Sequence, residues 1–303
     1  MKTPVAFIIF NRYEQTRRVF EMIRKVKPEK LLVISDGPSH DKVRAIIDTV
    51  DWPCTVLKNY SETNMGCRKR LSSGLTWVFE QVDRAIILED DCLPNESFFS
   101  FCEELLEKYK DDEEVMHISG NFFQKKPIEN SHYFSSIPHI WGWASWRRAW
   151  KYYDVDLKDW PNNTSLKEKL PGAVYEYWST VWKQYYENKI NSWDGQWMYT
   201  CLSRNGLCIT PTKNLVSNIG FGATGTHTKN KDSIFANMKT DEIEFPLIHP
   251  ERKILTKADM FTWKQNFGID RTWKQIILGN FRRRLPKIYM LFRHVFHRIF
   301  RFN

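Results

Sequence analysis

Three consecutive carboxylates, Glu89, Asp90 and Asp91, follow an apolar run at 85–88 in the stretch DRAIILEDDCLP. Such a run is typical of a buried parallel strand, so the three acids stand at its carboxyl end. Adjacent anions repel one another unless the loop is solvated or a positive charge lies close by. Mg²⁺ and Mn²⁺ prefer oxygen ligands, and Mg²⁺ often takes one or two carboxylates and completes its shell with phosphate and water. The stretch therefore favours a divalent-metal site that a diphosphate completes, with a solvated acidic loop as the alternative.

Strand-like and helix-like patterns alternate through the first third of the chain, and these elements must position the acids. The expected strands are 4–10, 30–35, 55–60, 85–88 and 115–119, and the expected helices are 13–26, 41–50, 67–82 and 95–110. Repeated strand–helix–strand units predict an α/β fold, with a mostly parallel sheet covered by helices on both faces. Beyond about residue 120 the pattern becomes irregular and rich in tryptophan, as expected where loops and short strands build a binding face.

Polar residues recur where the expected strands end, and ligands of such sheets bind outside the carboxyl ends of the strands. Besides the three acids, these residues are Asn11, Arg12, Asp36, Gly37 and Asn64. Each has a simpler interpretation when taken singly, such as a turn at Asp36-Gly37-Pro38. Phosphates also need cations, and Arg12, Arg68 and Arg70 lie close to the same edge. No GxGxxG or GxxxxGK[ST] loop follows the strands of the expected parallel sheet, which disfavours dinucleotide-binding and P-loop proteins.

The net charge of +9 comes mainly from the last residues of the chain. Residues 280–303 hold seven Lys and Arg and no acid, which leaves +2 for the rest. The excess of basic residues therefore lies in this segment rather than beside the sheet edge, and we expect no nucleic-acid partner. The six cysteines are scattered without a CxxC pair, and no apolar stretch has the length of a membrane span or a signal peptide. We therefore expect a cytoplasmic protein.

The basic segment 280–303 also has a helical apolar pattern. Its apolar residues follow i, i+3, i+4 spacing, and they are Ile288, Leu291, Phe292, Val295, Phe296 and Ile299. His and Arg residues occupy the opposite side, and Pro286 suits the first turn of a helix. A helix with one bulky apolar face and one basic face fits an anionic membrane surface. The segment predicts peripheral attachment to the cytoplasmic face of the membrane, with docking on the protein's own core as the alternative.

Several stretches together resemble a known family of enzymes. They are FNR, SDGP, NMGCRKRLSSGLTWVF, AIILEDDCLPNESFFSF and WGWASWRRAW. They look like bacterial nucleotide-diphospho-sugar glycosyltransferases of the GT-A fold, which are related to the N-acetylglucosaminyltransferase I group. The resemblance covers roughly residues 4–228. It implies a metal-dependent, inverting hexosyltransferase of bacterial surface polysaccharide synthesis, with Mn²⁺ or Mg²⁺ as cofactor. The expected donor is a UDP-sugar and the expected acceptor is a glycan, including a lipid-linked one.

The resemblance also implies roles for single residues on the nucleotide side. Arg12 and Asp36 match positions that contact the nucleotide base and ribose. Arg68 lies at the start of the helix that faces the diphosphate in the family. Glu89 and Asp90 match positions near the donor ribose and sugar.

Three further residues receive roles from the same resemblance. Asp91 matches the direct metal ligand. Trp143 belongs to the segment 141–150, which relatives place under the donor and acceptor sugars. His227, in the Gly- and Thr-rich stretch 218–230, is a candidate for a second metal or phosphate contact.

Asp194, in SWDGQWM, matches the region of the catalytic base, where relatives often have two adjacent acids and this chain has Asp194-Gly195. The residues themselves favour the same role. Asp194 is a lone acid between Trp193 and Trp197, where an apolar wall can raise its pKa and aromatic faces can stack on a sugar. The alternative is a capping residue at the start of a helix at 195–204.

We therefore expect a catalytic GT-A domain at 1–230, with a nucleotide-binding half at 1–120 and an acceptor-side half at 121–230. A C-terminal extension packed on it at 231–279 and the tail at 280–303 complete the chain. A sugar nucleotidyltransferase is one rival, although such enzymes usually have a Gly-rich loop after the first strand, where this chain reads FNRYEQTRR. A non-catalytic carbohydrate-binding protein of the same fold is the other, and the complete acidic triplet argues against it.

Overall fold

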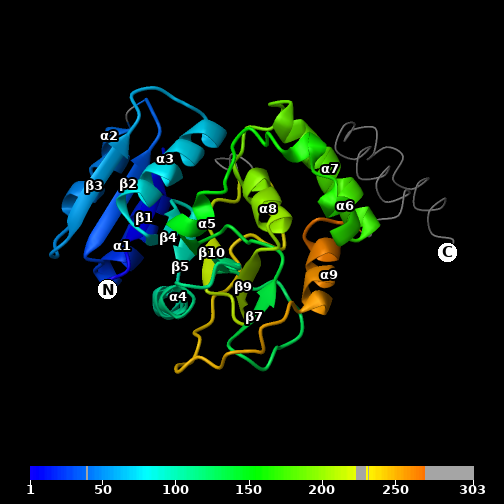
Figure 1. The fold of residues 1–303 in the computed structure, drawn as a ribbon. Helices are drawn as coiled ribbons and strands as arrows, with labels where there is room; N and C mark the ends of the chain where they lie inside the picture. Colours follow the sequence, from blue (N-terminus) through cyan, green and yellow to red (C-terminus); the bar gives the residue numbers. More distant parts are fainter. Residues whose placement is uncertain (39, 223–229, 231, 270–303) are drawn as a thin grey trace, which may run out of the picture.

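A sheet of eight strands forms the centre of the computed structural model, which describes residues 1–38, 40–222, 230 and 232–269 (Figure 1). The strand order is β3-β2-β1-β4-β8-β6-β9-β7, and β5 and β10 pair in a small second sheet. The strands are β1 (Val5–Ile9), β2 (Lys30–Ser35), β3 (Thr55–Tyr60), β4 (Arg84–Glu89), β5 (Cys92–Pro94), β6 (Val115–Ser119), β7 (His132–Ser135), β8 (Trp143–Trp146), β9 (Leu207–Pro211) and β10 (Val216–Asn218).

The first four strands form the parallel half of the sheet. The chain runs from β1 outward to β2 and β3, and then returns to place β4 on the other side of β1. This reversal is a topological switch point, and a crevice opens there between the carboxyl ends of β1 and β4. The pairing of Ile8 with Glu89 brings the end of β1 beside the start of the acidic triplet.

The second half of the sheet is mixed. Strand β8 runs antiparallel to both β4 and β6, β9 runs parallel to β6, and β7 runs antiparallel to β9. The small sheet joins β5 to β10 by pairing Cys92 with Asn218, and the amide of Ile219 donates to the carbonyl of Asp91 at 2.8 Å. The predicted α/β class with a mostly parallel sheet is confirmed, and the antiparallel strands lie where the sequence pattern became irregular.

The helices and 3-10 turns fill the connections. They are α1 (Tyr13–Val26), α2 (Asp41–Arg44), η1 (Ile47–Thr49), α3 (Cys67–Gln81), α4 (Glu96–Lys108), α5 (Arg147–Trp150), η2 (Trp160–Asn162), α6 (Ser165–Lys169), α7 (Gly172–Tyr186), α8 (Asp194–Ser203) and α9 (Thr256–Gln265). The side chain of Asn95 caps α4 by accepting a hydrogen bond from the amide of Phe98 at 3.0 Å. The single helix predicted at 41–50 is wrong, because the segment divides into α2 and η1.

Apolar layers cover both faces of the sheet. Val5, Phe7 and Ile9 of β1 pack with α1 and α4, whereas Ala6 and Ile8 point to the other face and pack with α3, α5 and α8. A third apolar cluster joins α6, α7, α8 and α9, which Figure 1 shows at the end of the molecule away from β3. Because every residue of β1 is buried, its backbone is a rigid support for the residues that follow it.

Residues 232–269 pack against the second half of the sheet. The carboxylate of Asp259 in α9 accepts hydrogen bonds from the hydroxyls of Ser135 and Ser136 at 2.6 and 2.7 Å, and Asn95 donates to the carbonyl of Asp241 at 2.8 Å. The predicted tail at 280–303 lies outside the described residues. In the part of the chain that is described, no helix is both long and apolar enough for a membrane span.

Candidate active site

A cavity of about 520 Å³ opens at the switch point, at the carboxyl ends of β1 and β4. This volume lies in the range of pockets that bind small molecules and cofactors. The cavity brings together residues that are far apart in the sequence. Among those predicted for the site, it is lined by Arg12, Asp36, Asn64, Arg70, Glu89, Asp90, Asp91 and Asp194.

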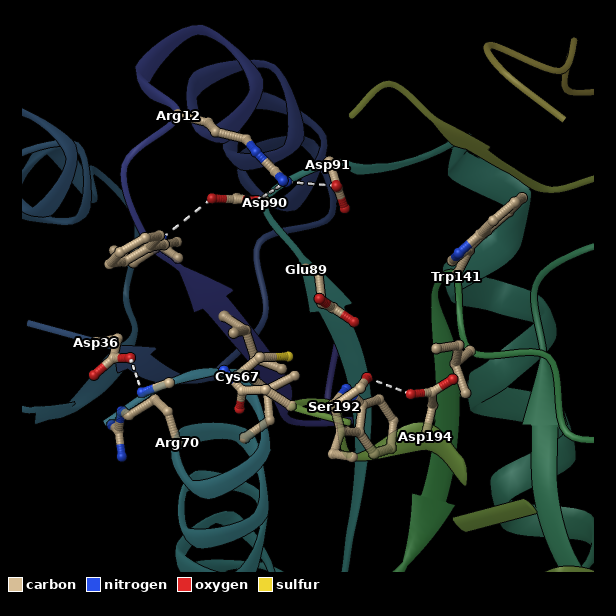
Figure 2. A pocket seen from close by; sticks show the side chains of 18 of the residues that line it. Arg12, Asp36, Cys67, Arg70, Glu89, Asp90, Asp91, Trp141, Ser192 and Asp194 are labelled. Atoms are coloured by element: carbon tan, nitrogen blue, oxygen red, sulfur yellow. Dashed lines mark hydrogen bonds and ion pairs between the residues drawn. The ribbon is translucent and has the colours of Figure 1, made fainter. Parts of the chain in front are cut away.

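The guanidinium of Arg12 lies between two acids of the triplet (Figure 2). Its Nη1 is 3.1 Å from Oδ1 of Asp90 and 2.5 Å from Oδ2 of Asp91. The other oxygen of Asp90 accepts a hydrogen bond from the amide of Phe10 at 3.1 Å. Arg12, which follows the end of β1, therefore supplies the acidic triplet with a positive charge from within the protein.

One guanidinium does not balance three carboxylates. Burial and the charge of Asp91 raise the pKa of Asp90 to about 7, although Arg12 acts in the opposite direction. Burial, followed by the charges of Asp91 and Asp90, raises the pKa of Glu89 well above its usual value. Burial by itself lowers the pKa of Arg12, but the charges of Asp90 and Asp91 together have the larger effect. The pKa of Arg12 is therefore raised above its usual value. The raised pKa values mean that Glu89 and Asp90 hold protons more tightly than usual, and a further cation would displace those protons.

The carboxylate oxygens of the cavity fit a hard divalent cation only when the substrate supplies further oxygen ligands. The oxygens of Asp90 and Asp91 are suitable ligands for Mg²⁺ or Mn²⁺. In the described ranges, however, no three His, Cys, Asp or Glu side chains are grouped for metal binding. Gly220 approaches Asp91 so closely that a Cβ there would lie 2.0 Å from Oδ2. The predicted ligand His227 lies outside the described residues.

Asp36 shapes the cavity through backbone amides. Its Oδ1 accepts from the amides of Gly37 and Met65, each at 2.9 Å, and its Oδ2 accepts from the amide of Gly66 at 3.1 Å. Gly66 has a φ of +77°, which favours glycine, and it also donates to Oδ1 of Asn64 at 2.9 Å. Asp36 therefore holds the loop before α3 against the end of β2. Its contact with a ribose stays a prediction.

The arginines of α3 bind protein carbonyls. Arg68 donates from Nη1 to the carbonyl of Tyr185 at 2.8 Å and to Oδ1 of Asn188 at 2.7 Å, and it does not line the cavity. This geometry does not agree with the prediction that Arg68 faces a diphosphate. Arg70 lines the cavity, but its Nε donates to the carbonyl of Ser35 at 3.2 Å and its Nη2 to Asn59. Burial lowers the pKa of Arg70.

Trp143 is a core residue and does not line the cavity. Its indole is fully buried and stacks on Trp193, with ring centroids 5.5 Å apart. Trp141, at the start of the same predicted segment 141–150, lines the cavity and is half-buried. Gly142, at a φ of +68°, separates the two tryptophans. Neither Asn11, which is exposed, nor Gly37, which is buried, is among the residues that line the cavity.

Asp194 lies in the cavity wall at the first residue of α8, so this helix begins one residue earlier than predicted. Its Oδ1 accepts hydrogen bonds from the hydroxyl of Tyr185 at 3.0 Å and from the hydroxyl of Ser192. Figure 2 shows Glu89 between the Ser192–Asp194 pair and the group formed by Arg12 and Asp91. Tyr185 and Ser192 were not predicted for the site, because neither belongs to a sequence pattern that marks one.

Cys67, also missed, lines the cavity near Glu89 and Asp194. Burial, followed by the charges of Glu89 and Asp194, raises the pKa of its thiol to about 12. A protonated thiol is a poor nucleophile, so the structure does not favour covalent catalysis by Cys67.

Comparison with known proteins adds structural neighbours only. No protein-family model and no curated protein matches the chain. GalNAc-T7, solved with UDP, GalNAc and Mn²⁺, is 10% identical, with a TM-score of 0.43 over 70% of this chain and 43% of that one. S. aureus TarS 1-349 is 10% identical, with a TM-score of 0.40 over 71% and 59%. UDP-glucose pyrophosphorylase complexed with UDP-glucose is 9% identical, with a TM-score of 0.36 over 70% and 90%.

The chain thus spans less than two thirds of the GalNAc-T7 and TarS chains that it matches. Structural neighbours include enzymes solved with uridine nucleotides or nucleotide sugars. The link to the N-acetylglucosaminyltransferase I group stays a prediction.

Proposed function

We propose that this protein is a metal-dependent, inverting glycosyltransferase that moves a sugar from a nucleotide diphosphate donor, expected to be a UDP-sugar, to a glycan acceptor. The proposal is carried by one observation. One cavity holds, at the switch point, three acids that share one guanidinium, and it also holds a separate carboxylate, Asp194, with its own hydrogen-bond donors. The first group suits a metal–diphosphate and the second suits a base.

The roles of the residues follow from their chemistry. Asp91, assisted by Asp90, would hold the divalent cation, which when bound neutralises charge on the diphosphate. Arg12 would bind phosphate oxygens when a metal takes its place beside Asp91. Asp194 would accept the proton of the acceptor hydroxyl as that oxygen attacks the anomeric carbon. A single attack from the side opposite the diphosphate inverts the configuration.

A nucleotide panel tests the proposal directly. We expect UDP with Mn²⁺ to raise the melting temperature, and UDP without metal to raise it less. A ligand that binds only the folded protein stabilises it by about 2.7 kcal/mol at a concentration 100-fold above Kd. Release of pyrophosphate from UTP and a sugar phosphate would instead identify a nucleotidyltransferase. No shift with any nucleotide or nucleotide sugar would refute the proposal.

We also propose that the basic segment 280–303 attaches the enzyme to the cytoplasmic face of the membrane. The enzyme would act there in bacterial surface polysaccharide synthesis. A lipid-linked acceptor would be met at that surface. We expect the full chain to co-sediment with vesicles that contain phosphatidylserine or phosphatidylglycerol, because each basic residue near such a surface adds about 1 kcal/mol. A chain that ends at Leu278 should stay in the supernatant. Equal sedimentation of both proteins, or of neither in low salt, would refute this attachment and leave the catalytic proposal intact.

A further inference from the structure

We infer that Tyr185 and Ser192 are positioning residues that hold Oδ1 of Asp194, so that Oδ2 is the atom that takes the proton from the acceptor. The inference rests on the proposed function, because it assigns parts to the base of that reaction. Tyr185, Ser192 and Asp194 come from the end of α7, the following loop and the start of α8, and all three line the cavity.

The two hydroxyls act on the same carboxylate oxygen. Tyr185 donates to Oδ1 of Asp194 at 3.0 Å, and Ser192 donates to the same atom. Among the residues that the structure describes, no hydrogen bond reaches Oδ2. A carboxylate with one oxygen held by two donors has a defined orientation, and its second oxygen keeps its lone pairs for the substrate.

Tyr185 is itself held rigidly. Its ring is buried, and it packs so closely on Gly195 that a Cβ at residue 195 would lie 2.1 Å from the ring. Arg68 binds the carbonyl of Tyr185 at 2.8 Å, and Trp182 donates from its indole nitrogen to the carbonyl of Gly195 at 3.1 Å. Arg68 therefore supports the base through the backbone of Tyr185. The glycine next to Asp194 is needed because any side chain would displace the ring.

Tyr185 can only donate in this arrangement. Burial and the charge of Asp194 raise the pKa of its hydroxyl above the usual range, so the hydroxyl stays protonated. In the transfer step the acceptor oxygen forms a bond to the anomeric carbon and its proton moves to Oδ2. The bond from that carbon to the phosphate oxygen breaks, and the nucleoside diphosphate leaves with the electron pair. The proton then passes to solvent.

The test compares Tyr185→Phe with Tyr153→Phe. Tyr153 is a matched control, because its hydroxyl also lies near α8 but bonds the carbonyl of Trp193 at 3.2 Å and the hydroxyl of Ser72. The reaction measured is UDP release from the UDP-sugar that gives the largest thermal shift with Mn²⁺. We expect Tyr185→Phe to lower kcat between about 10- and 100-fold, since small errors of position are costly in catalysis, with an unchanged Kd for UDP and Mn²⁺. Tyr153→Phe should keep kcat.

The pH profile separates positioning from simple loss of structure. Hydrogen bonds to a carboxylate favour its ionised form, which is the form that acts as base. Loss of the Tyr185 hydroxyl should therefore move the acid limb of kcat to higher pH. Ser192→Ala should move it in the same direction, and Tyr153→Phe should leave it in place.

A second pair of variants keeps both hydroxyls. Gly195→Ala should displace the ring of Tyr185 and lower kcat. Gly172→Ala is the control, because no atom lies within 4 Å of the added Cβ, and it should leave kcat unchanged. The inference is overturned when Tyr185→Phe keeps the kcat and the acid limb of the natural protein. It is also overturned when Tyr153→Phe lowers kcat as much as Tyr185→Phe does. Failure of the natural protein to bind UDP with Mn²⁺ or to release it from any donor would instead refute the proposed function, and the inference with it.

Discussion

Replacing Asp194 by asparagine is expected to lower turnover by at least about a hundredfold, the usual scale for a positioned general base. Asparagine keeps the shape of the side chain and can still accept a hydrogen bond from Tyr185, but its amide nitrogen cannot take a proton. Donor binding should be preserved, because Asp194 lies apart from the Arg12–Asp91 group. The measurement is kcat at saturating acceptor, together with Kd for UDP and Mn²⁺ by calorimetry.

The control for this experiment is the stereochemistry of the product. NMR of the anomeric proton should show inversion, which a single base and a direct displacement require. Near-normal turnover of Asp194→Asn at saturating acceptor would place the base elsewhere. A retained anomeric configuration would contradict the direct displacement even when Asp194 is essential.

Replacing Asp91 by alanine is expected to abolish the part of UDP binding that depends on Mn²⁺. Asp91 is buried at the switch point and its Oδ2 is paired with Arg12, so this oxygen stands where a metal and a diphosphate would meet. Calorimetric titration of UDP with and without Mn²⁺ measures the difference. Circular dichroism should show that the fold is kept. An unchanged affinity for UDP with Mn²⁺ would refute the assignment of Asp91 as metal ligand.

Arg12→Gln is the matched variant, because it keeps all three acids and removes their cation. Arg12 and a metal compete for the oxygens of Asp90 and Asp91. Mn²⁺ alone should therefore bind more tightly to Arg12→Gln than to the natural protein, and UDP less tightly, because a phosphate partner is lost. Weaker binding of Mn²⁺ to the variant would show that Arg12 does not occupy the place of the metal.

Local pattern was sufficient for the nucleotide-binding half of the fold. The predicted ranges 13–26, 30–35, 55–60 and 115–119 agree with α1, β2, β3 and β6. Buried parallel strands are continuous apolar runs and covering helices are amphipathic, so both are visible in a short window of sequence. The antiparallel strands β7 and β8 are four residues each and were not predicted. Their pairing depends on partners far along the chain, such as Ala144 with both Ile86 and Ile118.

The same division holds for the candidate site. The sequence by itself determined that Arg12 and the acidic triplet share one edge, because parallel strands place their carboxyl ends together. Only the tertiary structure decided how each polar side chain is used. Arg68 is of a residue type that commonly binds phosphate. Its guanidinium instead donates to carbonyl oxygens of residues more than 80 positions away in the sequence. Tyr185 reaches Asp194 because α7 packs on α8, and no local pattern specifies which hydroxyl a buried carboxylate will meet.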